Sequence, residues 1–353
     1  MEGAPDRILG YAAVVGIALG EVAVVLDVGA RLFGCYVRTP LRAGVRAILV
    51  VGLAVLLALP LGLLAIDWES RAGRLLLGPF GLLGALLFVH FLFPYRYGIG
   101  KVLDRAQCTR VRELGGGVVL RDLAVTLDSL PGPAAGLTML VVSDLHCNSR
   151  AHLDLIKECL ARLDREEVDL VCMLGDFGEK RGLLDELVVA IAGLPARFGV
   201  FCVRGNHDFG GGRARILRSL LAENGVKLLD NRAYEIRDLG VLLVGLESPW
   251  VSSPLPEPKL GQFVLGLTHT PDNIAAFADL GAAFVVAGHT HGGFLRLPFI
   301  GPLFVPSRYG RFLDAGLFAL RDTLMYVTPG VGYPSPVAAT TPEIVRITLT
   351  GRR

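Results

Sequence analysis

The stretch that decides the fold is Ala282–Gly293, which reads AAFVVAGHTHGG. It begins with a short apolar run of the kind that forms a buried strand. His289 and His291 follow, and because extended backbone points residues i and i+2 to the same side, their imidazoles can converge on one point. The glycines around them allow a sharp turn and leave room for a ligand. An isolated pair of this kind also fits a polar turn with two solvated histidines, so the rest of the chain has to decide.

The same arrangement, an apolar run that ends in Asp, Asn or His, occurs at four places upstream. Stretches with helical spacing, such as HLDLIKECLARL, separate the runs, and this alternation predicts an α/β domain. Because the carboxyl ends of strands are where α/β sheets build their sites, the endings are expected to meet. The runs are LTMLVVSDLH with Asp144 and His146, VDLVCMLGD with Asp176, FGVFCVRGNHD with Asn206, His207 and Asp208, and QFVLGLTHT with His269.

Five blocks of this sequence, SDLH, GDF, RGNHD, THTPDN and GHTHGG, resemble in order the signature blocks of the calcineurin-like metallophosphoesterases. The resemblance extends from about Leu137 to the C-terminus. It implies an α/β fold of four layers, a metallophosphoesterase sandwich in which two mixed sheets are flanked by helices. It also implies two metal ions at one edge of the sandwich.

The resemblance assigns a role to each polar strand ending. His207 matches the histidine that meets the scissile phosphate, and Asp208 matches the acid that orients it. Asp176 would bridge the two metals, because neighbouring cations need a shared carboxylate to screen their repulsion. One metal would be held by Asp144, His146, Asp176 and His291, and the other by Asp176, Asn206, His269 and His289.

The ligand types restrict the metal. Imidazole, carboxylate and amide groups without thiolate suit borderline divalent ions, so we expect Mn first, with Fe, Co or Zn as alternatives, rather than Ca. Two such ions would clamp phosphate oxygens and lower the pKa of a bridging water. A histidine beside them could stabilise transition-state charge or protonate the leaving oxygen.

The N-terminal part has a different composition. Apolar residues make up 52% of the 353-residue chain, and the mean hydropathy is +0.53. Ile48–Ile66 and Leu75–Phe93 are long uncharged runs that predict membrane helices, whereas Ile8–Leu26 is a weaker candidate because it contains Glu21. The sequence therefore predicts a membrane anchor of two or three transmembrane helices with a basic linker over residues 1–112, and a phosphoesterase domain over residues 113–353.

Charge near these runs predicts their orientation. Arginines lie between the first and second runs, and basic residues from Arg96 to Arg112 follow the third, whereas the Asp67–Arg74 loop has balanced charge. The positive-inside rule then places the catalytic domain in the cytoplasm, on a multi-pass protein of the inner (cytoplasmic) membrane. The six cysteines contain no CxxC pair, which fits a reducing compartment. A net charge of +2 gives no reason to expect nucleic acid as a partner.

The C-terminal part also resembles a membrane-associated branch of the family that includes a UDP-2,3-diacylglucosamine diphosphatase type. One departure is Phe294, where that branch is expected to carry a polar glutamine. The resemblance implies a dimetal enzyme that hydrolyses a phosphodiester or diphosphate bond in a phosphorylated lipid or nucleotide-linked substrate, such as a UDP-linked acylated sugar of lipid A type biosynthesis. The alternatives are a noncatalytic membrane scaffold or sensor with the same fold, and a general phosphodiesterase or phosphatase acting on another lipid or nucleotide.

Overall fold

The computed structural model describes residues 4–34, 71–92, 98–163, 168–247, 249–251, 254–259, 261–297, 299–332 and 340–352. The chain divides into two compact units. The larger unit comprises Gly98–Arg296 and Leu313–Arg353, and the smaller one comprises Met1–Tyr97 and Leu297–Phe312.

The larger unit contains two seven-stranded mixed sheets. In the first sheet four strands run parallel, and β16 pairs parallel with β3 but antiparallel with β4. The spatial order is β2 (Ala106–Gly115), β3 (Val118–Leu127), β16 (Glu343–Gly351), β4 (Thr138–Val142), β5 (Leu170–Met173), β6 (Val200–Cys202) and β7 (Lys227–Leu228).

The second sheet also has a parallel centre, formed by β9, β10, β11 and β15, with antiparallel strands at its edges. Its order is β1 (Gly100–Lys101), β14 (Gly316–Leu320), β15 (Thr323–Val327), β11 (Phe284–Ala287), β10 (Phe263–Thr268), β9 (Val241–Leu246) and β8 (Ala233–Ile236).

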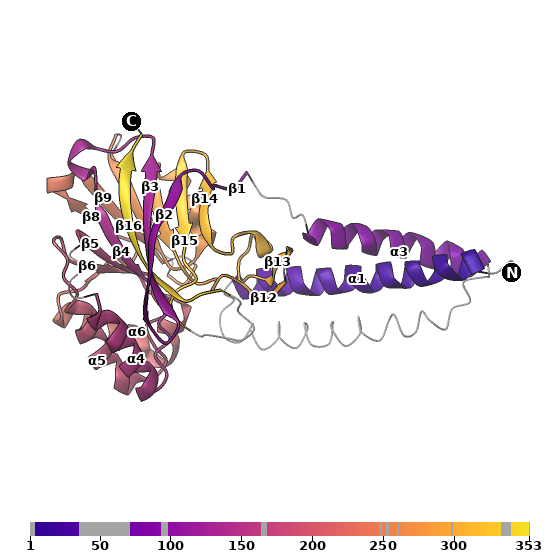
Figure 1. Ribbon diagram of the computed structural model, residues 1–353, viewed down its shortest axis with the longest axis horizontal. Helices are drawn as coiled ribbons and strands as arrows, with labels where there is room; N and C mark the ends of the chain where they lie inside the picture. The colour runs from indigo at the N-terminus through magenta and orange to yellow at the C-terminus, as the bar shows by residue number, and fades with distance from the viewer. Residues whose placement is uncertain are drawn as a thin grey trace. The chain divides into compact units, whose positions relative to one another are not determined.

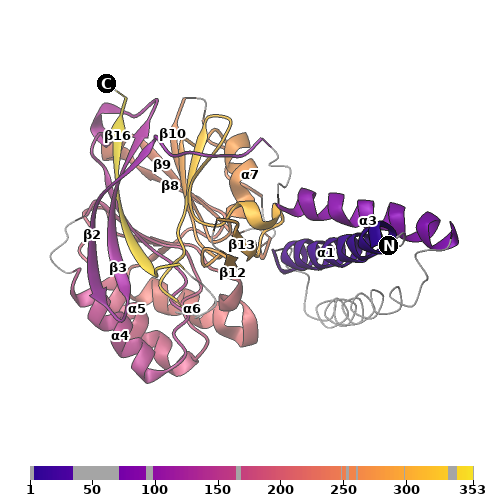
Figure 2. The ribbon, with the colours of Figure 1, turned by 45° about the vertical axis from the view of Figure 1, so that its right-hand side comes forward.

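Two apolar cores hold these layers together. One lies between the sheets, where Val141 and Phe201 of the first sheet pack with Leu265 and Val286 of the second. The other lies between the first sheet and the helices α4 (Arg150–Ala161), α5 (Arg181–Ala192) and α6 (Arg213–Glu223), which gather on one face of the sheet (Figure 1). Helix α7 (Ile274–Asp279) packs against the second sheet (Figure 2). The α/β fold with two mixed sheets that the resemblance implies is thus confirmed.

Local sequence explains these elements. Helix α4 begins after Ser149, whose hydroxyl accepts a hydrogen bond from the backbone amide of His152, and it buries Leu153, Ile156 and Leu160 along one face. The short strands β5 and β11 are buried throughout, and β4 is buried except at its first residue, as expected for strands covered on both sides.

The smaller unit contains α1 (Ala4–Gly34), α3 (Arg71–Leu92) and β13 (Gly301–Phe304), and β12 (Phe294–Leu297) ends at its boundary. Helices α1 and α3 lie side by side in both views (Figures 1 and 2). They approach closely at glycines, since a Cβ on Gly16 would lie 2.4 Å from the carbonyl oxygen of Gly81, and one on Gly84 would lie 2.2 Å from that of Gly16.

The runs Ile8–Leu26 and Leu75–Phe93, predicted as membrane spans, fall largely within α1 and α3. Among the residues that the structure describes, no helix combines the length and the apolar character that crossing a membrane requires. These two predicted spans are therefore not supported. The predicted span Ile48–Ile66 lies outside the described residues.

Candidate metal centre

The carboxyl ends of five parallel strands deliver the predicted ligands to one edge of the sandwich. Asp144 and His146 follow β4, Asp176 follows β5, and the remaining ligands follow β6, β10 and β11. Three groups of side chains have ligand atoms within 4.8 Å of one another, and Asp176 and His146 each belong to two of them. The groups are Asp144, His146 and His291; His146, Asp176 and His207; and Asp176, His269 and His289.

The two aspartates form the centre of this cluster. Oδ1 of Asp144 lies 3.9 Å from Nε2 of His146, 3.9 Å from Nε2 of His269 and 3.7 Å from Nε2 of His291. Oδ2 of Asp176 lies 3.5 Å from Nε2 of His146 and 3.3 Å from Nε2 of His269. Oδ1 of Asn206 lies 3.1 Å from Nε2 of His269, so the amide oxygen belongs to the same cluster.

The residues fit divalent metal ions. Oδ1 of Asp144 is fully buried, accepts no hydrogen bond within the described residues, and has three imidazole nitrogens around it. A buried carboxylate oxygen without a donor is costly unless a cation balances it. Nitrogen and oxygen donors without thiolate are the set that borderline divalent ions prefer. The chain would thus hold such ions with the seven residues that the resemblance assigned.

The backbone supports this interpretation. Five of the seven residues have φ in the left-handed region, which non-glycine residues seldom adopt and which costs on the order of 1–3 kcal/mol each. Such strain persists where surrounding structure requires it, and it is common at functional sites. The five are Asp144 (54°), His146 (42°), Asp176 (54°), His289 (72°) and His291 (51°).

Two glycines let the strand ends approach the aspartates. A Cβ on Gly288 would lie 2.0 Å from Oγ of Ser143, and one on Gly205 would lie 2.2 Å from Oδ1 of Asp176. Ser143 Oγ and the backbone amide of His289 both donate to Oδ2 of Asp144, at 2.5 and 2.9 Å. These contacts orient the Asp144 carboxylate so that its other oxygen faces the imidazoles.

Burial determines the protonation of two histidines. It lowers the pKa of His146 to about 4, and burial together with the charge of His269 lowers the pKa of His289 to about 3. Both rings are therefore neutral at physiological pH. Neutral imidazole is the form that binds a metal.

The remaining charges compensate one another. Burial opposes protonation of His269, but Asp176 and Asp144 outweigh it and raise the pKa of His269 to about 9. Burial likewise opposes ionisation of Asp144 and Asp176, yet the surrounding histidines, His269 first, lower the pKa of both carboxyls. The site without metal thus keeps both carboxylates ionised, with the protonated His269 beside them.

His207 lies at the edge of the cluster with its ring half exposed, and its Nδ1 is 3.1 Å from Oε1 of Glu179. The predicted orienting acid, Asp208, has another role, because its two oxygens accept hydrogen bonds from the backbone amides of Asp176, Phe177 and Gly205. Glu179 replaces it as the acid beside the imidazole. Glu179 was not predicted from the sequence, although it stands only three residues after Asp176 in the GDFGE stretch.

Trp250 and Glu247 were not assigned a role from the sequence. The indole of Trp250 contacts the rings of His269 and His289 edge to face, with centroids 5.4 and 5.9 Å away. Glu247 is buried and accepts three hydrogen bonds from Arg204, one from its backbone amide and two from its guanidinium. The segment after β9 thus lies beside the ligands through Trp250.

Comparison with known proteins agrees with this geometry. The family model described as calcineurin-like phosphoesterase matches residues 137–293. Phosphodiesterase YaeI of Escherichia coli is 30% identical over 212 residues, which cover 56% of this chain and 76% of that protein. The chain belongs to the calcineurin-like phosphoesterase family.

Two further relatives come from a bacterium and a fish. Metallophosphoesterase YkuE of Bacillus subtilis is 28% identical over 216 residues, which cover 58% of this chain and 74% of that protein. A transmembrane protein with metallophosphoesterase domain from Danio rerio is 23% identical over 318 residues, which cover 76% of this chain and 71% of that protein.

This calcineurin-like phosphoesterase is a metal-dependent hydrolase of phosphoric ester bonds. When bound, the metal ions supply charge neutralisation at phosphate oxygens and a more acidic water. The protein itself orients the Asp144 carboxylate through Ser143 and the Asp176 carboxylate through the backbone amide of His207, and it keeps His146 and His289 neutral by burial. His207, held beside Glu179, is placed to donate a hydrogen bond or a proton to a leaving oxygen.

Proposed function

We propose that the protein hydrolyses a phosphodiester or diphosphate bond of a lipid-linked substrate, with two Mn ions, at the cytoplasmic face of the inner membrane. The ligand cluster is the observation that supports the reaction class, because all seven predicted ligand residues are present and lie together. A noncatalytic scaffold would be expected to have lost some of them. The phosphodiesterase activity named for the Escherichia coli relative supports an ester with two substituents.

The smaller unit supports a location at the membrane. Its paired helices expose many large apolar side chains, among them Tyr11, Val15, Phe80, Leu82 and Leu86. Exposed apolar patches of this kind mark surfaces that contact other molecules or lipid. The Danio rerio relative is named as a transmembrane protein. Its alignment covers 76% of this chain, which is more than residues 113–353 alone make up, so it extends into the N-terminal part.

Basic residues near the smaller unit in sequence support a location at the cytoplasmic face of the membrane. Arg105, Arg110 and Arg112 follow the smaller unit in sequence, and each basic residue near an anionic leaflet contributes about 1 kcal/mol of attraction. UDP-linked acylated glucosamine is the substrate we favour, because it contains a diphosphate. Two metal ions would neutralise charge on the phosphate that is attacked and on the phosphate that leaves. Hydrolysis would release UMP and an acylated sugar phosphate.

The experiment is a substrate panel with the full-length, Mn-loaded protein in detergent. UDP-diacylglucosamine is compared with its unacylated counterpart, and a chromogenic diester reports the basal reaction. We expect UMP release to be faster from the acylated substrate. Equal rates would contradict the lipid assignment, and no UMP beside cleavage of the diester would contradict the diphosphate assignment. No cleavage of any substrate, either by the Mn-loaded protein or after loading with Fe, Co or Zn, would contradict the reaction class.

A further inference from the structure

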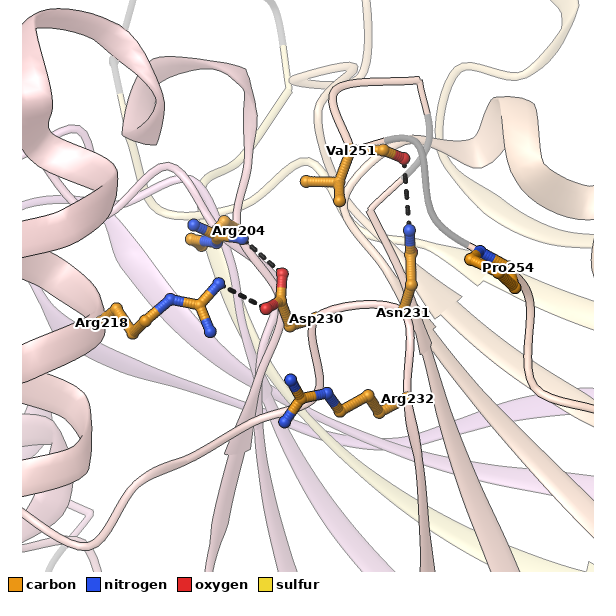
Figure 3. Close-up of a pocket in the computed structure, with 7 residues that line it drawn as sticks. All are labelled: Arg204, Arg218, Asp230, Asn231, Arg232, Val251 and Pro254. Carbon is orange, nitrogen blue, oxygen red and sulfur yellow. Dashed lines mark hydrogen bonds and ion pairs between the residues drawn. The ribbon is translucent and has the colours of Figure 1, made fainter.

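A second polar cavity lies on the same edge of the sandwich as the metal ligands. Its volume is about 380 Å³, and its lining includes three arginines (Figure 3). The lining residues follow the carboxyl ends of β6, β7 and β9, except for one that comes from α6. They are Arg204, Arg218, Asp230, Asn231, Arg232, Val251 and Pro254.

The three arginines do not have equal roles. Arg204 is almost completely buried, and it pairs with Glu247 at 2.8 Å and with Asp230 at 2.5 Å. Its guanidinium also stacks on the ring of Phe209, with 4.7 Å to the ring centroid. A group with this many fixed partners forms a wall of the cavity and is not available to a ligand.

Arg218 and Arg232 are available. Nη2 of Arg218 contacts Oδ2 of Asp230, while about half of the Arg218 side chain stays exposed. Arg232 is exposed, and within the described residues its guanidinium makes no hydrogen bond or ion pair. Asp230 and Glu247 pair with the other two arginines, so the charge of Arg232 has no carboxylate within ion-pair distance among the described residues.

The cavity shares two segments with the metal centre. Arg204 lies two residues before Asn206, and Val251 directly follows Trp250, whose ring contacts His269 and His289. Asn231 holds the segment that carries Trp250 and Val251 in place. Its Oδ1 accepts a hydrogen bond from the backbone amide of Glu247, and its Nδ2 donates one to the carbonyl oxygen of Val251. The cavity and the metal centre are therefore neighbours along both segments.

We propose that this cavity is a subsite for a second anionic group of the substrate, separate from the phosphate that is cleaved. Arg232 and Arg218 would bind that group through charge-assisted hydrogen bonds, which the planar guanidinium forms well with phosphate and carboxylate. The assignment rests on the proposed phosphoesterase reaction and adds to it a preference for substrates with two anionic groups. Phosphate and carboxylate share this chemistry, so the test includes both.

The test compares three p-nitrophenyl phosphodiesters that differ only in the second alcohol, which is propyl, 3-phosphopropyl or 3-carboxypropyl. Full-length Mn-loaded protein is assayed by release of p-nitrophenolate. For the better of the two anionic esters we expect kcat/KM to exceed that of the propyl ester about tenfold or more, since one charge-assisted contact is worth that much. Whichever pendant group gives the larger ratio identifies the anion.

Arg232→Gln should reduce that ratio to about one, because it removes the guanidinium and leaves no buried partner unpaired. Arg215→Gln is the matched control, because Arg215 is exposed on the same helix as Arg218 but does not line the cavity, and it should keep the ratio. A wild-type ratio near one, or an equal loss in both variants, would overturn the subsite.

A binding measurement separates the subsite from the reaction. Chelator-treated full-length protein is titrated with sodium sulfate in a calorimeter, so that no metal contributes to anion binding. Saturable sulfate binding that Arg232→Gln abolishes and Arg215→Gln retains would support the subsite. If none of the three esters were cleaved, that failure would count against the proposed function alone, and the binding result would still support the subsite. Binding that is absent, or unchanged in Arg232→Gln, would refute the subsite.

Discussion

Asp176 makes more contacts within the site than a metal ligand alone would need. Its Oδ2 lies within 3.5 Å of two imidazoles, and its Oδ1 accepts a hydrogen bond of 2.8 Å from the backbone amide of His207. The backbone amide of Asp176 in turn donates to Asp208. The same residue therefore links the ligand cluster to the turn that presents His207.

We expect Asp176→Asn to abolish nearly all activity and to remove most of the bound metal, because it takes away the carboxylate shared by two ligand groups. Metal content by elemental analysis, measured beside turnover of a chromogenic diester, checks this. Asp185→Asn, at an exposed position on α5, is the control and should change neither value. An Asp176→Asn protein that kept two metals would contradict the bridging role.

His207→Ala should behave differently. The imidazole is half exposed and pairs with Glu179, so its loss should leave the metals bound and lower kcat about a hundredfold or more. Turnover and metal content are again measured on the same sample. A His207→Ala protein without metal would place His207 among the ligands and would contradict its role as an acid.

Metal affinity should rise with pH. With a pKa of about 9, His269 carries a proton at neutral pH in the metal-free protein, whereas His146 and His289, with pKa values of about 4 and 3, do not. Binding must then displace at least the proton of His269, so affinity should increase about tenfold or more per unit between pH 6 and 8. Competition with a chelating dye at several pH values measures the slope. An affinity independent of pH would contradict the protonation of His269.

At the scale of elements, the close approach of α1 and α3 depends on residues without side chains. A Cβ on Gly84 would lie within 3 Å of the backbone of Gly16 and Ile17, so Gly84→Leu should force the two helices apart. Backbone amides of α1 and α3 should therefore exchange with deuterium faster in Gly84→Leu than in the parent protein, as followed by mass spectrometry. Leu83→Ile, at an exposed position of α3, is the control and should exchange like the parent. Equal exchange in all three proteins would contradict the packing.

At the scale of the whole molecule, the larger unit contains both sheets, both cores and all seven predicted ligands. A chain that begins at Gly98 should therefore fold and keep kcat/KM for a soluble diester within about threefold of the full-length value. The same chain should lose most of its activity on a lipid-linked substrate in vesicles, if the smaller unit holds the enzyme at the membrane. Inactivity on both substrates, with the truncated chain still folded by circular dichroism, would contradict this division of roles.

Most of the site could be predicted from the sequence alone. Each ligand follows an apolar run, and the rule that parallel strands present their carboxyl ends at one edge is enough to bring Asp144 and Asp176 together in one sheet and His269 and His289 together in the other. The alternation of runs and helical stretches likewise predicted the α/β fold. These are local patterns, and strand geometry converts them directly into positions in space.

Only the tertiary structure could decide which side chains meet across segments that lack such a pattern. Glu179, and not Asp208, lies against His207, because the short turn after Asp176 folds back over the turn after β6 while backbone amides occupy Asp208. The arginine cavity depends on loops after three different strands and on one face of α6. Loop conformation depends on contacts with distant parts of the chain, and residue spacing does not encode those contacts.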